Sequence, residues 1–143
     1  MSSIHIGNDH GGYSLAMKIV DKMIQKKLNI THHGCCSDIS TDYPVFAKRV
    51  VESIQDYTGS VGILICGTGI GMSMAANRYY YARSAVCHNI TYARLAREHN
   101  DANVLCLPGR FMEFDDAWAI VKTFLTTPFS EEDRHTKRLE MFK

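Results

Sequence analysis

The sequence lacks any long apolar run and any large excess of charge. Its 143 residues carry 16 basic and 15 acidic side chains, which leaves a formal net charge of +1. A chain so nearly neutral has no broad electrostatic field to attract nucleic acid or an anionic membrane. No stretch approaches the roughly 18 consecutive apolar residues that a membrane-spanning helix needs. We therefore expect no nucleic-acid or membrane partner, and a small ligand with local charge instead.

The sequence also lacks a regular cysteine pattern. Its five cysteines are an odd number, with one adjacent pair and no repeated spacing, which is a poor basis for a disulfide framework. A chain of this length with 45% hydrophobic residues can bury a core without cross-links. Residues 1–10 lack the basic patch and apolar stretch of a secretory signal. We predict a cytoplasmic protein that folds as one domain over residues 1–143.

Only three prolines interrupt an alternation of short apolar runs with longer stretches of helical period. This alternation is typical of a parallel sheet with crossover helices. Strands are expected at residues 3–7, 28–32, 61–66, 84–87 and 103–107. Helices are expected around residues 15–24, 45–57, 72–76, 91–98, 115–125 and 132–142. The predicted fold is α/β: a doubly wound, Rossmann-like, five-stranded parallel sheet with helices on both faces.

Chemically reactive residues follow several of the predicted strands. In open α/β sheets, ligands bind beyond the carboxyl ends of the strands. The positions there are Asn8, Asp9 and His10 after the first strand, Cys66 after the third, His88 after the fourth, and Gly109 with Arg110 after the fifth. We expect these residues to line one crevice.

The segment after the third strand reads Cys-Gly-Thr-Gly-Ile-Gly at residues 66–71. Its glycines allow backbone N–H groups to converge on an anion at the start of a helix. Met72 stands where a dinucleotide-binding loop needs glycine and where a cysteine-dependent phosphatase needs arginine, and the Gly-Lys-Ser/Thr of nucleoside triphosphatases is missing. We predict that the loop holds a phosphate or an enediolate oxygen through Gly67, Thr68, Gly69, Ile70 and Gly71.

Cys66 itself stands at the end of a strand and the start of a helix. The positive end of the helix dipole favours a thiolate there, which can act as a base or as a nucleophile. The alternative is a buried core cysteine of the kind expected at Cys87 and Cys106. The residues alone leave both interpretations open.

Several separated blocks resemble the ribose-5-phosphate isomerase B family, and the match spans nearly the whole chain. In order, they are GNDHGG at 7–12, DYP at 42–44, CGTGIGM at 66–72 and AREHNDANVL at 96–105, followed by PF at 128–129 and RHTKR at 134–138. One block departs from the family pattern. A proline-glycine turn is expected where residues 78–83 read RYYYAR.

The resemblance implies interconversion of ribose 5-phosphate and ribulose 5-phosphate through an enediol, in the pentose phosphate pathway and without a metal or organic cofactor. It implies that His99 opens the sugar ring, that Cys66 moves the proton between C1 and C2, and that the loop amides with Thr68 stabilise the enediolate. Arg134 and Arg138 are four residues apart and would grip the phosphate from one helix face. The remaining implied site residues are Asp9, His10, Tyr43, Asn100 and Arg110.

Each assignment has an ordinary structural alternative. His99 could end a helix, where a cation favours the helix dipole. The two late arginines could be a solvated helix face that pairs with Glu131 and Glu132. Asp9 and His10 could form a cap and a surface turn, and the tyrosines at 79–81 could belong to an interface or to the core.

His32, His33, Cys35 and Cys36 resemble metal ligands at first sight. Neighbours in an extended chain point to opposite sides, and no second ligand pair has a familiar zinc spacing. We interpret this segment as an ordinary strand end and predict no metal site.

Two further functions stay open at this point, namely isomerisation of allose 6-phosphate or galactose 6-phosphate, and non-catalytic binding of a phosphosugar. Galactose-6-phosphate isomerase divides its active-site features between two different subunits, whereas Cys66, Thr68 and His99 all occur in this chain. The resemblance implies a homodimer, or a dimer of dimers, with active sites at the subunit boundary.

Overall fold

The computed structural model describes residues 3–142 and contains one five-stranded, all-parallel sheet. The strands are arranged in the order β2-β1-β3-β5-β4. Their bounds are β1 Ile4–Asn8, β2 Ile30–His32, β3 Val61–Cys66, β4 Ser84–Val86 and β5 Val104–Pro108. The predicted α/β fold is confirmed.

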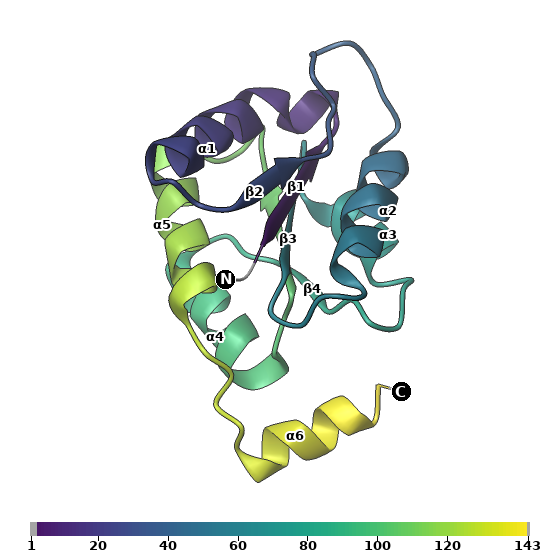
Figure 1. Ribbon diagram of the computed structural model, residues 1–143, viewed down its shortest axis with the longest axis vertical. Helices are drawn as coiled ribbons and strands as arrows, with labels where there is room; N and C mark the ends of the chain where they lie inside the picture. Colours follow the sequence, from purple (N-terminus) through teal and green to yellow (C-terminus); the bar gives the residue numbers. More distant parts are fainter. Residues whose placement is uncertain (1–2, 143) are drawn as a thin grey trace.

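Helices cover both faces of the sheet (Figure 1). Helices α1 Tyr13–Gln25, α4 Ile90–Asn100 and α5 Phe114–Thr126 lie on one face, and α2 Tyr43–Ile54 and α3 Ile70–Ala76 lie on the other. The last helix, α6 Asp133–Glu140, stands away from both layers at one end of the molecule. None of the helices within residues 3–142 is long and apolar enough to cross a membrane.

The central strand β3 divides the hydrophobic core into two. Because alternate side chains of a strand point to opposite faces, Ile63 and Ile65 belong to the core under α1, α4 and α5, while Leu64 and Cys66 belong to the core under α2 and α3. Both faces are buried, which explains why β3 is a continuous apolar run and not an alternating one.

The observed helix ends differ from the predicted ones near the candidate site. Helix α2 begins at Tyr43, two residues early, because Pro44 suits the first turn of a helix. Helix α4 continues through His99 and ends at Asn100, and Asp101 caps it in the left-handed conformation at φ 44°. A short 3-10 helix, η1 His10–Gly12, was not predicted.

Gly12 occupies a position where no other residue fits. A Cβ atom built on Gly12 would lie 2.0 Å from the carbonyl oxygen of Ile65 in β3. Gly12→Ala is therefore expected to destabilise the fold by about 3 kcal/mol, because the backbone of η1 or β3 must move. Gly67→Ala is the matched control, since its Cβ meets only the Arg110 side chain, at 3.3 Å. Urea unfolding of both variants checks this, and equal midpoints would contradict it.

Candidate active site

Three turns meet at the carboxyl edge of the sheet, after β1, β3 and β5. The N–H of Gly109 donates to the carbonyl of Cys66 (2.8 Å), and the N–H of Arg110 donates to the carbonyl of Gly67 (3.1 Å). A Cβ on Gly11 would lie 3.0 Å from the nitrogen of Gly67, and one on Gly109 would lie 3.0 Å from the oxygen of Gly11. The three turns are in backbone contact, which brings Asp9, His10, Cys66 and Arg110 to one edge of the sheet. Asn8 does not line the crevice as predicted, because its side chain is fully buried.

The Cys66 thiol lies beneath the glycine loop that leads into α3. Only 5% of the residue is exposed, and its Sγ accepts the N–H of Gly69 at 3.1 Å. Gly69 reaches this position through a left-handed backbone, at φ 78°, a conformation that glycine adopts without steric cost. The loop therefore directs an N–H dipole at the sulfur, an arrangement that suits negative charge there.

All five cysteines are free thiols, but only Cys66 belongs to the glycine loop. Burial raises the pKa of Cys87 to about 11, and it raises the pKa of the fully buried Cys106 further. These two thiols therefore stay protonated at neutral pH. The prediction that Cys87 and Cys106 are core residues is confirmed.

Thr68 and Tyr43 border the same loop. The Thr68 hydroxyl oxygen accepts the N–H of Ile70 at 3.2 Å, at the exposed side of the loop. The Tyr43 ring lies over Gly71, because a Cβ on Gly71 would come within 2.7 Å of its Cζ atom. Together they place one hydroxyl group and one aromatic ring beside the anion loop.

Asp9 and His10 form the turn after β1. A side-chain oxygen of Asp9 accepts the N–H of Gly12 at 3.0 Å, so the carboxylate caps η1 as the ordinary structural alternative expected. The His10 ring is half-buried, and its Nδ1 accepts the N–H of Thr41 at 3.1 Å. The capped turn holds both side chains at the sheet edge that carries Cys66.

Arg110 extends across the start of the glycine loop. Its guanidinium would lie 3.3 Å from a Cβ on Gly67, and the residue is exposed. Arg110 and Gly109 also line an adjacent cleft of about 500 Å³, together with His88. A positive charge therefore stands next to the loop.

His99 does not lie at this edge. It occupies the last turn of α4, where its ring stacks on that of His135 with 4.3 Å between centroids and 19° between planes. His135 is 5% exposed, and its Nε2 is buried without a hydrogen-bond partner in the part of the chain that the structure describes. Burial lowers the pKa of His135, as do the neighbouring charges of His99, Arg134 and Arg138, while Glu132 opposes them.

Arg134 and Arg138 both lie on α6 and are both exposed. The Nε of Arg134 donates to a Glu132 carboxylate oxygen at 3.0 Å, the surface pairing expected as an alternative to phosphate binding. The carbonyl of Glu98 accepts the N–H of Ser130 at 3.1 Å, which ties the start of the α6 segment to α4. His99, Asn100 and the two arginines thus belong to one end of the molecule.

The two groups of candidate residues lie at opposite ends of the strands. The group around Cys66 lies at the carboxyl ends, and the group around His99 lies near the amino ends. Cys66 pairs with Pro108 at the end of β5, whereas Asn100 shortly precedes Val104 at its beginning. Val104 is four residues from Pro108, roughly 13 Å at about 3.3 Å per residue. Proton transfer needs hydrogen-bond contact, at about 3 Å. Within one chain, Cys66 and His99 are therefore too far apart to contact each other.

The segment of His32, His33, Cys35 and Cys36 forms no cluster. The rings of His32 and His33 bond to Asn8 and His5 respectively, at 2.6 and 2.9 Å. Within residues 3–142, no group of three histidine, cysteine or acidic side chains could hold a metal ion.

Comparison with known proteins shows which family shares this sequence. The Ribose/Galactose Isomerase family matches residues 4–142. The chain belongs to this family. Isomerase relatives match it at full length: "Ribose-5-phosphate isomerase B" of Escherichia coli K12 is 37% identical over 140 residues, which are 98% of this chain and 93% of the relative. A "putative sugar phosphate isomerase" of Rickettsia typhi is 44% identical over 99% of this chain and 97% of its own.

Solved structures of the isomerase family share the fold. A ribose 5-phosphate isomerase from Thermotoga maritima superposes with a TM-score of 0.95 and 45% identity, over 99% of this chain and 97% of its own. Ribose-5-phosphate isomerase B from Mycoplasma genitalium, solved with bound ribulose-5-phosphate, has a TM-score of 0.91 and 37% identity, over 97% and 92% of the two chains.

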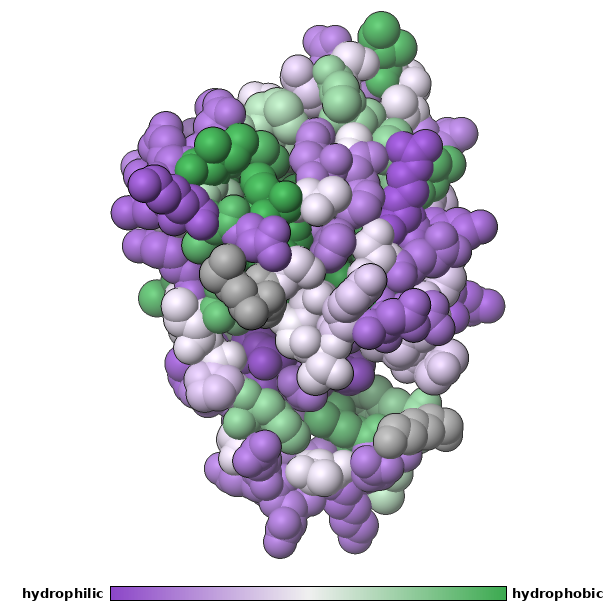
Figure 2. All heavy atoms as spheres, in the orientation of Figure 1, coloured by the Kyte–Doolittle hydropathy of each residue, from purple (hydrophilic) through white to green (hydrophobic). Residues whose placement is uncertain are grey.

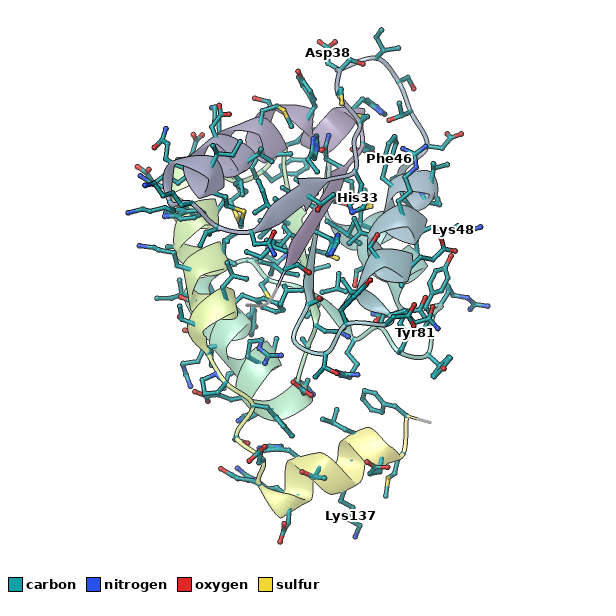
Figure 3. The ribbon with its side chains drawn as sticks, viewed as in Figure 1. His33, Asp38, Phe46, Lys48, Tyr81 and Lys137 are labelled. Carbon is teal, nitrogen blue, oxygen red and sulfur yellow. The ribbon has the colours of Figure 1, made fainter. Side chains whose placement is uncertain are left out.

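The segment that departs from the isomerase pattern is divided between core and surface. Tyr79 and Tyr81 are half-buried against the core under α2 and α3, whereas Tyr80 is 81% exposed. Tyr81 lies on the α2 side of the molecule (Figure 3), with its ring centroid 5.3 Å from that of Tyr80. The tyrosine stripe is thus partly core, while Tyr80 is available to another surface.

Alkylation is expected to inactivate this isomerase through Cys66, and phosphosugar is expected to slow the loss. The reason is that the thiol lies beneath the loop predicted to hold the substrate. Cys36 is exposed and is expected to be alkylated too. The measurement therefore follows activity together with mass-spectrometric labelling of each cysteine in a Cys36→Ala background. Equal rates with and without ribose 5-phosphate would contradict this placement.

Proposed function

We propose that this chain interconverts ribose 5-phosphate and ribulose 5-phosphate through an enediol intermediate. The observation that carries the proposal is the Cys66 thiol at the end of β3, beneath a glycine loop whose N–H groups can meet an oxyanion. The names of the full-length relatives support it, as does the ribulose-5-phosphate bound in one of their structures. The reaction belongs to the pentose phosphate pathway, and we propose a cytoplasmic location.

In the proposed reaction, the Cys66 thiolate removes the proton from C2 of the open-chain aldose. The electron pair of that C–H bond forms the C1–C2 double bond, and the carbonyl electrons move onto the oxygen at C1. The loop amides and the Thr68 hydroxyl stabilise this negative oxygen. The thiol then delivers a proton to C1 and becomes a thiolate again. The C2 hydroxyl forms the C2 carbonyl as its proton moves to the negative oxygen at C1, which leaves the neutral ketose. No step requires an oxidant or a cofactor.

The proposed phosphate site uses the cationic side chains. Arg134 and Arg138 lie one turn apart on α6, and each guanidinium can hold two phosphate oxygens. Binding the phosphate would compete with the exposed pair between Arg134 and Glu132, which is a weak interaction. His10, Arg110 and Asn100 complete the proposed contacts, and Asp9 and Tyr43 line the sugar.

We propose that two copies of the chain build each active site, the Cys66 edge coming from one and the His99 edge from the other. Helix α6 stands away from the body, and Figure 2 shows a hollow between them. A cleft of about 440 Å³ beside the edge strand β4 includes Asn100 in its lining, with Tyr80 and Phe142. Exposed apolar side chains on α3, Ile70 and Met74, continue from the glycine loop. A second copy that fits its loop into this cleft would join the two half-sites.

The test of the function is a substrate panel. Purified protein is offered ribose 5-phosphate, allose 6-phosphate and galactose 6-phosphate, and ketose formation is measured for each. The proposal expects the highest kcat/KM for ribose 5-phosphate. A higher value for either six-carbon substrate would overturn the substrate assignment, and binding of all three without turnover would establish a non-catalytic phosphosugar-binding protein.

A further inference from the structure

The loop of residues 34–42 connects β2 to α2 and passes over the carboxyl edge of the sheet. Figure 3 shows Asp38 at its tip, well beyond the strands, and Ile39 is 72% exposed. The root of the loop is nevertheless fixed to the end of β1. The N–H of Asn8 donates to the carbonyl of Gly34 (2.7 Å), and the N–H of Cys35 donates to the carbonyl of Asn8 (2.6 Å).

The fully buried Asn8 side chain strengthens this attachment. Its amide nitrogen donates to the carbonyl oxygens of Asp9 (3.0 Å) and Cys35 (3.1 Å). Its oxygen lies 2.6 Å from Nε2 of His32 and accepts a hydrogen bond there, since the amide nitrogen faces the two carbonyls. Loop root, β1 and β2 therefore form one hydrogen-bonded unit directly before the site residues.

The far end of the loop returns to the site through Thr41. The Thr41 hydroxyl oxygen accepts the backbone N–H of His10 (3.1 Å), and the Thr41 N–H donates to Nδ1 of the His10 ring (3.1 Å). The same hydroxyl lies 3.8 Å from the Cys35 sulfur. Because a backbone N–H can only donate, Nδ1 of His10 must present its lone pair, and the ring proton must be on Nε2.

We propose that Thr41 is a positioning residue that holds His10 as the Nε2–H tautomer, so that His10 meets the sugar phosphate as a hydrogen-bond donor. The inference rests on the proposed function. The His10–Gly12 turn abuts Gly67, and Nε2 of His10 bonds to no other group among residues 3–142. The two ring nitrogens face away from each other, so fixing Nδ1 on the loop leaves Nε2–H for the ligand. The positive charge of the phosphate site then comes from the arginines alone.

The direct test is ¹⁵N NMR of the histidine rings in the full-length protein, with and without inorganic phosphate. The His10 signals are assigned by their loss in the His10→Gln variant. The proposal expects Nδ1 at the shift of an unprotonated nitrogen and Nε2 at that of a protonated one, in both samples. A proton on Nδ1, alone or in a doubly protonated ring with phosphate bound, would overturn it. Because this readout does not use turnover, it is separate from any failure of the isomerase assay.

A pair of Thr41 variants tests the positioning. Thr41→Pro removes the N–H that fixes Nδ1, whereas the matched Thr41→Ala retains it and loses only the hydroxyl. The expected result is a mixture of His10 tautomers in Thr41→Pro and the single Nε2–H form in Thr41→Ala. The single form in both variants would show that Thr41 does not determine the tautomer.

A pair of His10 variants keeps the proposal testable if the proline variant does not fold. The amide nitrogen of glutamine can take the place of Nε2, while the amide oxygen of asparagine takes only the place of Nδ1. For ribose 5-phosphate, His10→Asn is expected to raise KM by roughly ten- to a hundredfold, the effect of losing a hydrogen bond to a charged group. His10→Gln is expected to raise it less than about tenfold. The reverse order, or equal losses, would overturn the donor role.

Discussion

Replacing Cys66 by alanine is expected to lower kcat for ribose 5-phosphate by about 10²–10⁴-fold, the effect of losing a positioned acid-base group. KM is expected to change little, because the phosphate is held by residues on other elements. Serine at this position should behave similarly, since its hydroxyl is a far weaker base than a thiolate at neutral pH. Steady-state kinetics with the purified variants measure both constants.

The control for this substitution is Cys36→Ala, which removes an exposed thiol of the loop between β2 and α2. Its kcat is expected to match that of the wild type. Thermal unfolding of each variant separates lost chemistry from lost fold, because Cys66 also belongs to the core under α2 and α3. Near-normal turnover in a folded Cys66→Ala protein would remove the thiol from the mechanism.

Mixing Cys66→Ala chains with His99→Asn chains is expected to restore activity that neither variant has alone. In a hybrid dimer, one of the two sites combines the intact Cys66 of one chain with the intact His99 of the other. With random exchange, half of the dimers are hybrids, so activity should recover to about a quarter of the wild-type value. The rate of ketose formation after mixing measures this.

The control is a mixture of two chains that both carry Cys66→Ala, one of them with His99→Asn in addition. No pairing of these chains forms an intact site, so no activity is expected. Native mass spectrometry of differently tagged chains verifies that subunits exchange. Exchange without recovery would place Cys66 and His99 in the pocket of one chain, which the separation of β3 and the end of α4 argues against.

The sheet was predictable because its strands carry unambiguous apolar runs. VGILIC at residues 61–66 is buried on both faces and became the central strand. Because the strands are parallel, the residues that follow β1, β3 and β5 were expected to meet at the carboxyl edge of the sheet. Helix α2 begins two residues earlier than predicted, because Pro44 suits the first turn of a helix.

The relation between the two halves of the site could not be predicted from the chain's periodicity. The pattern predicted a helix ending near residue 98, but α4 runs through Asn100, and its direction carries His99 away from Cys66. The stack of His99 on His135 was missed, because it joins residues of two helices that no local pattern relates. The only sequence signal was the position of His135 next to Arg134, inside a block already attributed to the phosphate.

The two hydrogen bonds between Thr41 and His10 were also not predicted. It depends on a loop whose root pairs with β1, a tertiary contact between residues about 30 positions apart. The start of this segment, residues 32–36, carries the histidines and cysteines that resembled metal ligands. In the structure, His32 and Cys35 hold the loop against Asn8 and form no cluster of ligands.

The central claim is that the protein moves a carbon-bound proton from C2 to C1 of the sugar by way of an enediol intermediate. Exchange of this hydrogen with solvent tests the claim most directly. Ribose 5-phosphate is incubated with the protein in deuterium oxide and followed by NMR until the two sugars reach equilibrium. The account predicts deuterium at C2 of ribose 5-phosphate and at C1 of ribulose 5-phosphate, with incorporation lost in Cys66→Ala. Isomerisation at the normal rate with the original hydrogen fully retained would contradict it.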